Sequence, residues 1–211
     1  MKKLLTTFMM CLCMAKGVAF AQDNTWNLTL FQDYKPAVVH MADGRNVKAR
    51  LSNIFLKNAS LLFKRGDATM EANMDPIVSV DFDTLHYVKI DNMLALEVDS
   101  VGANKLYCAV LIDLDSYKAM LRNNVNISSL SLGDQISYTT IDLTPPEGMQ
   151  LPLVRHYFYL YNGEIFKVHE REITRRMPKE KKRMFRTIIG MSDFSWSEDN
   201  SLMKLLKAIS E

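Results

Sequence analysis

Short segments of alternating apolar and polar residues, separated by tight polar turns, fill the stretch 36–90. Asp43-Gly44 is a strong signal for a two-residue hairpin turn, because both residues tolerate positive φ. The alternation over 46–52 that follows predicts a half-buried strand. Three further turns are expected at Lys57-Asn58, Arg65-Gly66-Asp67 and Asp75-Pro76. Strands this short need partners to bury their apolar rows, so we predict a small β-barrel or β-sandwich.

The strand pattern resumes after Ile90, and the clearest hairpin lies at 154–171. Asn162-Gly163 forms its turn, and a two-residue loop sets the pairing on either side of it. This register places Tyr159 opposite Phe166 and, farther from the turn, His156 opposite His169. Between these regions we expect a short helix over 117–122, capped by Asp115-Ser116, then a loop over 123–133 and a strand over 136–143.

The C-terminal segment changes from strand to helical periodicity. One helix is expected to begin at Pro178 and to stop at Gly190, with Met184, Phe185 and Ile188 on its buried side. A second helix is expected after a Ser197 cap, with a buried stripe at Leu202, Leu205, Leu206 and Ile209. The predicted fold class is therefore mainly β (a β-rich α+β fold), with barrel or sandwich strands followed by two C-terminal helices.

Residues 1–21 have the pattern of a secretory signal peptide. Lys2 and Lys3 precede an uncharged apolar run, and Ala19-Phe20-Ala21 supplies small residues for cleavage before Gln22. The full chain has 26 basic and 24 acidic residues, and the segment contains three of the lysines, so 23 basic residues face 24 acidic ones in the mature chain. This balance gives no argument for nucleic-acid binding. Cys108 alone remains in the mature chain, which excludes an intrachain disulfide.

The pair His156 and His169 is the sharpest chemical feature of the sequence. Directly opposed residues in a hairpin have Cβ atoms about 4.5–5.5 Å apart, which would let two imidazoles share a zinc ion. A zinc site needs at least a third ligand, and no further histidine is near in sequence. A partly exposed polar pair is the alternative. Asp81, Asp83 and His86 are a weaker candidate for acid–base or metal chemistry, because strand alternation puts the two aspartates on one face and His86 on the other unless a bend intervenes. A polar strand end is the alternative.

The densest charge in the chain lies at 175–186. Lys179, Lys182, Arg183 and Arg186 are expected on the exposed side of the first C-terminal helix, opposite its apolar stripe. Such a face could contact an acidic protein or an anionic membrane surface. A solvated helix face without a ligand is the alternative interpretation.

Several phrases of the chain resemble a family of uncharacterised exported proteins from Gram-negative bacteria. They are Tyr34-Lys35-Pro36, Asp43-Gly44-Arg45, the run 53–58, Val168-His169-Glu170-Arg171, Pro178-Lys179 and Phe194-Ser195-Trp196. The resemblance spans nearly the whole mature chain and implies an envelope or secreted protein, but it carries no activity and no site residues. Separately, the strand–Asp43-Gly44–strand unit resembles the opening of SH3-like or Sm-like barrels over 36–90, which transfers no function.

These observations predict an exported binding protein rather than an enzyme. We divide the mature chain into an N-terminal β unit at 22–90 and a second β unit with the helical tail at 91–211, which could share one core. The expected partner is a protein of the bacterial envelope, in the periplasm or outside the cell. Zinc binding at His156 and His169, as a metal carrier or metal-dependent enzyme, is one alternative. Binding to an anionic membrane surface is the other.

Overall fold

The computed structural model describes residues 28–124 and 151–211. They form a ten-stranded antiparallel sheet, with one helix after β8 and the other helices after β10. The predicted signal peptide, the strand expected at 136–143 and most of the loop expected at 123–133 lie outside these residues. The strands are β1 (Lys35–Met41), β2 (Asn46–Phe55), β3 (Ser60–Arg65), β4 (Ala68–Glu71), β5 (Ile77–Phe82), β6 (Leu85–Ile90), β7 (Met93–Val101), β8 (Asn104–Ile112), β9 (Leu153–Tyr161) and β10 (Glu164–Lys167). The helices are α2 (Leu114–Asn124), α3 (Glu170–Arg176), the 3₁₀ turn η2 (Lys179–Lys181), α4 (Lys182–Ile189) and α5 (Asp199–Ser210). The prediction of a mainly β fold is confirmed.

The turn residues lie between strands as the sequence predicts. Asp43-Gly44 lies in the turn between β1 and β2, but the two-residue loop expected there is wrong: His40 pairs with Asn46, the Met41 N–H donates to the Arg45 carbonyl, and only Gly44 of the two has a positive φ, at +84°. Asn162 and Gly163 join β9 to β10 at φ +52° and +82°, the left-handed conformation that a tight primed turn requires. The predicted register is confirmed next to this turn, where Tyr161 pairs with Glu164 and Tyr159 with Phe166.

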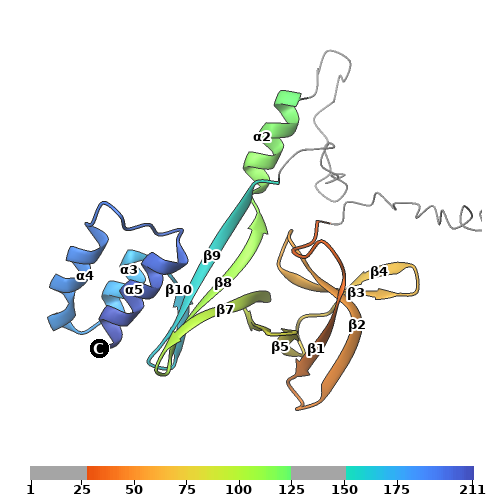
Figure 1. Ribbon diagram of the computed structural model, residues 1–211, viewed down its shortest axis with the longest axis horizontal. Helices are drawn as coiled ribbons and strands as arrows, with labels where there is room; N and C mark the ends of the chain where they lie inside the picture. The colour runs from red at the N-terminus through yellow and green to blue at the C-terminus, as the bar shows by residue number, and fades with distance from the viewer. Residues whose placement is uncertain (1–27, 125–150) are drawn as a thin grey trace, which may run out of the picture.

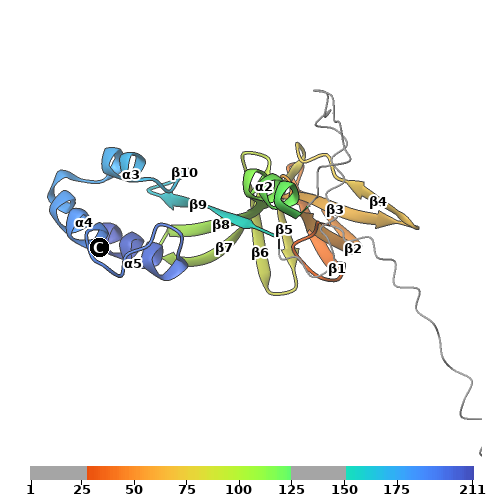
Figure 2. The same ribbon diagram turned by 90° about the horizontal axis from the view of Figure 1, so that it is seen from above.

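The sheet runs in the order β10-β9-β8-β7-β6-β5-β1-β2-β3-β4 and curls strongly at its N-terminal end. The backbone N–H of Leu94, at the start of β7, donates to the carbonyl oxygen of Ala59, just before β3, at 2.8 Å. The curled strands β1–β6 make one lobe, and the C-terminal helices make another. The long strands β7, β8 and β9 join the two lobes (Figures 1 and 2).

The N-terminal core lies inside the curl and includes an aromatic cluster. The ring centroids of Phe31 and Phe82 are 5.0 Å apart, and those of Phe82 and Tyr87 are 5.7 Å apart. The core also takes residues from beyond position 90, namely Leu94, Ala95, Tyr107, Ala109 and Phe158. One sheet and one core therefore cross the division between 22–90 and 91–211.

The burial expected for 46–52 is incomplete. Val47 pairs with buried Val39, yet Val47 and Leu51 are each 46% exposed. The reason is strand length: β3 pairs only with residues 52–55 of β2, so the first part of β2 has a partner on one side alone. This part of β2 forms an open rim of the N-terminal lobe.

The second core is held by three tyrosines of β9. The hydroxyl of Tyr157 donates to the Asp199 carboxylate at 2.5 Å, that of Tyr159 to the Leu202 carbonyl at 2.6 Å, and that of Tyr161 to the Ile209 carbonyl at 2.9 Å. From Tyr157 to Tyr161 a strand advances about 14 Å, and from Asp199 to Ile209 a helix advances about 15 Å. The two lengths match, so α5 lies along this part of the sheet as a strap: its backbone packs over β7 and β8, and the β9 tyrosines reach it with their hydroxyls. The predicted stripe of Leu202, Leu205, Leu206 and Ile209 is confirmed as buried.

Other expectations about the helices need correction. Three α-helices, not two, follow β10 in the described C-terminal segment, because residues 170–176 form α3 instead of extending the hairpin. Ser197 does not cap α5; Glu198 precedes that helix and makes no side-chain cap hydrogen bond. Met184 is 38% exposed rather than buried, since the inner side of α4 is centred on Phe185 and Ile188.

The helix α2 begins earlier than expected, directly after Asp113. The Asp113 carboxylate accepts from the backbone N–H groups of Asp115 and Ser116 at 3.2 and 3.0 Å, which are otherwise unpaired donors at a helix start. Among the residues with described positions, no helix has the length and apolar character needed to cross a bilayer.

Candidate functional site

The four basic residues singled out by the sequence lie together on η2 and the outer side of α4. We call this set the basic face: Lys179, Lys182, Arg183 and Arg186. An α-helix turns by about 100° per residue, so Lys182, Arg186 and Arg183 follow one another around one flank of α4. Phe185 and Ile188 occupy the buried side, and Met184 is on the opposite flank. The three cations of α4 therefore share one flank of that helix, and Lys179, expected on the same helix, lies on the 3₁₀ turn that precedes it.

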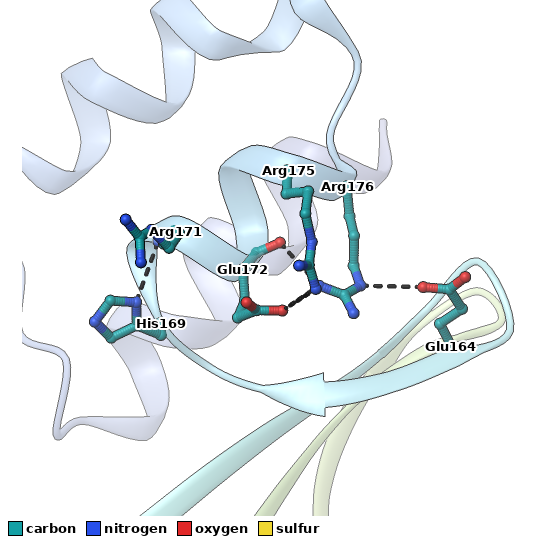
Figure 3. Close-up of polar contacts among 6 residues, drawn as sticks. All are labelled: Glu164, His169, Arg171, Glu172, Arg175 and Arg176. Carbon is teal, nitrogen blue, oxygen red and sulfur yellow. Dashed lines mark hydrogen bonds and ion pairs between the residues drawn. The ribbon is translucent and has the colours of Figure 1, made fainter.

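The charges of the basic face have no protein partner. Across the two described segments, none of these four side chains forms a hydrogen bond or ion pair. The neighbouring helix α3 is different, as Figure 3 shows: Glu172 accepts from Arg175 at 2.6 Å and from Arg176 at 2.5 Å. Arg176 also reaches Glu164 of β10 at 3.0 Å (Figure 3). Arg175 and Arg176 of α3 are thus paired with glutamates, whereas the neighbouring cations of the basic face form no ion pair within the described segments.

The pKa values of this ion-pair network follow from its geometry. The hydrogen bond from Arg176 is the main cause that holds the pKa of Glu172 below its ordinary value, and the nearby Arg175 charge adds to it. The same bond raises the pKa of Arg176. Glu172 is therefore ionised and committed to α3, and it cannot also neutralise the basic face.

A shallow concavity of about 440 Å³ connects α3 to the basic face. Its lining is mostly cationic or hydrogen-bonding and consists of His169, Glu170, Arg171, Thr174, Arg175 and Lys182. Lys182 belongs both to this concavity and to the basic face. The arrangement offers charge and N–H donors at a surface, the groups that hold carboxylates and phosphates.

The prediction that His156 and His169 stand opposite each other in the hairpin is wrong. The strand β10 ends at Lys167, and the last cross-strand bond runs from the Val168 N–H to the Tyr157 carbonyl at 2.8 Å. His169 then turns away to cap α3, where its Nδ1 accepts from the Arg171 N–H at 3.2 Å (Figure 3). The chain leaves the strand here because a capping side chain and the acidic first-turn residues Glu170 and Glu172 favour a helix start.

His156 stays in the sheet, opposite Ala109 of β8. Burial, with a smaller effect of the nearby Lys167 charge, lowers its pKa below the ordinary value. Searching residues 28–124 and 151–211 finds no group of three or more histidine, cysteine or acidic side chains placed to hold a metal ion. Zinc binding by His156 and His169 remains a prediction.

A polar cluster built on the weaker candidate residues Asp81 and His86, with His40 and Asn46 that sequence reasoning missed, lies on the outer face of the N-terminal lobe. Asp81 accepts from His40 Nε2 at 2.6 Å and from His86 Nδ1 at 2.5 Å, while His40 Nδ1 lies 2.8 Å from the Asn46 amide oxygen. Asp81 and His86 are direct cross-strand neighbours in the β5–β6 hairpin. The expectation that they lie on opposite faces is therefore wrong, because alternation was continued through Asp83-Thr84, which is a two-residue turn. Treating those residues as a turn would have found the pair.

The strongest candidate for recognition is thus the basic face with its adjoining concavity, and its chemistry is that of anion binding. Comparison with known proteins adds no relative: no family model, no curated protein and no solved structure matches this chain.

Proposed function

We propose that this chain is a non-enzymatic binding protein of the bacterial envelope, whose basic face holds an acidic surface of a partner protein. The observation that carries the proposal is the set of neighbouring cations on η2 and α4 whose side chains form no ion pair within the described structure. Export is inferred from the signal-peptide pattern at 1–21. The mature chain carries no excess of positive charge, so the clustering is local rather than a consequence of composition.

The electrostatic repulsion among the cations of α4 supports the proposal that an anionic partner binds there. Lys182 and Arg186 are four positions apart on α4, and Arg183 and Arg186 are three apart. Like charges at these spacings destabilise a helix by about 0.2–0.5 kcal/mol per pair. In α3, by contrast, a single glutamate compensates two arginines. A carboxylate-rich partner would offset the repulsion in α4 at the moment of binding.

The lining of the concavity supports binding rather than catalysis. The imidazole of His169 is occupied as the cap of α3, and the surrounding side chains are cations, a glutamate and a threonine. Such groups position an anion through charge-assisted hydrogen bonds. The shallow form of the site favours a protein surface over a small substrate, since small-molecule sites are typically deep and mostly apolar.

The test compares two variants of the mature chain 22–211 that reverse equal numbers of charges. The first carries Lys182→Glu, Arg183→Glu and Arg186→Glu. The control carries Lys48→Glu, Arg50→Glu and Lys57→Glu, which are exposed residues of the other lobe and also have no ion pair within the described segments. Each protein is used to capture partners from a native envelope fraction. A zero-length carboxyl-to-amine cross-linker is then applied, and the joined residues are identified by mass spectrometry.

We expect Lys179 and Lys182 to be joined to aspartates or glutamates of one stoichiometric partner. Capture should be lost in the first variant, retained in the control, and weakened by salt, because the Debye length falls from about 10 Å at 0.1 M to about 3 Å at 1 M. Retention by the first variant would contradict the proposal. Charge-dependent binding to anionic vesicles without a protein partner would support the membrane alternative instead, and turnover of an envelope substrate would exclude a purely binding role.

A further inference from the structure

A second, more enclosed cavity lies between the two cores. It has a volume of about 360 Å³ and extends from the aromatic cluster of the N-terminal lobe to the start of α5. We call it the central cavity. Its walls are largely apolar and include Leu30, Phe31, Leu96, Val98 and Val110. These five side chains are only partly buried, so a cavity of ligand size is lined by hydrophobic surface that remains in contact with water.

One wall of the central cavity is fixed in place by a buried amide. Asn53, fully buried on β2, accepts from the Phe31 N–H at 3.0 Å and donates to the Phe31 carbonyl at 2.8 Å. The Phe31 ring is held against Phe82 and Tyr87. The wall is thus formed before any ligand arrives, which lowers the ordering cost of binding.

Tyr87 supplies a polar group on the inner side. Its side chain lines the cavity and is only 3% exposed, yet its hydroxyl has no hydrogen-bond partner in the described part of the chain. By contrast, the hydroxyls of Tyr157, Tyr159 and Tyr161 each donate to an acceptor of the protein. Burial raises the pKa of Tyr87 to about 12, so the phenol keeps its proton and remains a donor.

The cavity mouth carries a weakly engaged arginine. Arg155 Nη1 lies 3.8 Å from the Asp199 carboxylate and 3.5 Å from the Tyr157 hydroxyl, both long distances for a hydrogen bond. Asp199 already accepts a short bond of 2.5 Å from Tyr157. The guanidinium of Arg155, whose side chain is 54% exposed, therefore retains the two-pronged donor geometry that fits a carboxylate.

We propose that the central cavity binds a small amphiphile with a single carboxylate head. The apolar body lies against Phe31, Leu96 and Val110, and the head accepts hydrogen bonds from Arg155. A monoanion fits better than a phosphate monoester, because Asp199 next to the arginine repels a second negative charge. This site is distinct from the basic face, so either proposal can fail without the other.

The experiment is calorimetric titration of the mature chain 22–211 with decanoate, below its micelle concentration, and with decanol as the uncharged analogue. We expect saturable one-to-one binding of decanoate. Arg155→Gln should weaken decanoate binding about tenfold and leave decanol binding unchanged, since charge-assisted bonds to the head are lost. Asp199→Asn should strengthen decanoate binding, because it removes the competing charge while keeping an acceptor for Tyr157. Leu96→Trp should abolish binding of both compounds by filling the cavity.

The control is Arg171→Gln, which removes one cation from the concavity beside the basic face. If this variant weakens decanoate binding and Arg155→Gln does not, the anion binds at the basic face and the proposal is wrong. Unchanged binding in the Arg155→Gln and Asp199→Asn variants, or no saturable binding to the wild-type chain, would also overturn it. Both variants alter exposed side chains, so the outcome does not depend on whether Leu96→Trp folds.

Discussion

At the scale of single residues, the His40–Asp81–His86 cluster makes the stability of the N-terminal lobe sensitive to pH. The hydrogen bond to Asp81, followed by that to Asn46, raises the pKa of His40 above its ordinary 6.5. Burial alone would raise the pKa of Asp81, but the hydrogen bonds from His40 and His86 outweigh it and hold this pKa below the ordinary 3.8. Lys48 lies in the same cross-strand row, opposite Val38, which itself pairs with Asp81.

The two shifts have opposite consequences for pH dependence. The contribution of His40 is complete below its ordinary 6.5 and is lost as the pH rises through the raised value. The contribution of Asp81 is complete above its ordinary 3.8 and is lost as the pH falls through the lowered value. The cluster therefore stabilises the fold most between these two pH values.

Melting temperatures of the wild type and the Asp81→Asn variant test this between about pH 3 and pH 9. We expect the difference between them to be largest from 3.8 to 6.5 and to shrink as the pH rises further. The control is Asp67→Asn, which changes an exposed carboxylate in the β3–β4 turn. A difference that does not vary with pH would show that Asp81 acts through packing or neutral hydrogen bonds alone.

At the scale of elements, the junction between β10 and α3 separates two roles for His169. As a cap, its imidazole satisfies the Arg171 N–H, and losing a cap costs about 0.5–2 kcal/mol. We expect His169→Ala to lower the free energy of unfolding by this amount. His169→Asn should keep most of the stability, because asparagine is among the best capping residues. Urea unfolding of the two variants provides the comparison.

Zinc dialysis of the same proteins addresses the alternative role. A metal ligand at His169 predicts that alanine and asparagine both remove bound zinc, and that His156→Ala does so as well. If His169→Asn is as unstable as His169→Ala, the cap does not account for this residue. Stoichiometric zinc in the wild type that is lost in all three variants would support the metal site.

Local chemistry explains which elements could be predicted. Asn162-Gly163 sets both a turn and a register, so the pairs next to it followed from sequence. The same register failed at His169, two residues beyond the last paired residue Lys167, because alternation and a helix cap are both consistent with Val168-His169-Glu170. Lys182, Arg183 and Arg186 were placed correctly on a helix, whereas Lys179 lies on the 3₁₀ turn before it. Their lack of partners could not be predicted, since Glu164 and Glu172 are brought to Arg176 by the tertiary fold.

The central cavity was beyond sequence reasoning for a different reason. Its walls join the lead segment at Leu30 and Phe31 to β7 and β8, and its mouth joins β9 to α5. The periodicity of apolar residues along the sequence does not show which residues from distant segments come together. The Asp81–His86 pair lies between these extremes, because a turn at Asp83-Thr84 is a local feature that predicts a cross-strand contact.

At the scale of the whole molecule, the two lobes share β7, β8 and β9 rather than a linker (Figure 2). The fragment 22–90 therefore lacks part of its own core, including Leu94, Tyr107 and Phe158. Burying one large apolar side chain contributes about 1.5–3 kcal/mol, and a whole domain is stable by only about 5–15 kcal/mol.

We expect the isolated fragment 22–90 to be unfolded while the chain 22–211 is folded. The measurement is the dispersion of amide signals in proton–nitrogen correlation spectra of both proteins. Sharp, well-dispersed signals from the fragment would instead establish 22–90 as an independently folding domain.

The strap formed by α5 has a mechanical consequence. Its hydrogen bonds to Tyr157, Tyr159 and Tyr161 are arranged one after another along β9, and Glu211 follows directly after the helix (Figure 1). A force applied at Glu211 loads the Asn104–Ser210 bond and the bonds from Tyr161 and Lys181 to Ile209 first, and the Tyr159 contact only after these have broken. The contacts of the helix therefore break one after another instead of all at once. A force applied at Glu211 should therefore detach α5 at a lower value than the force needed to separate the strands of the sheet.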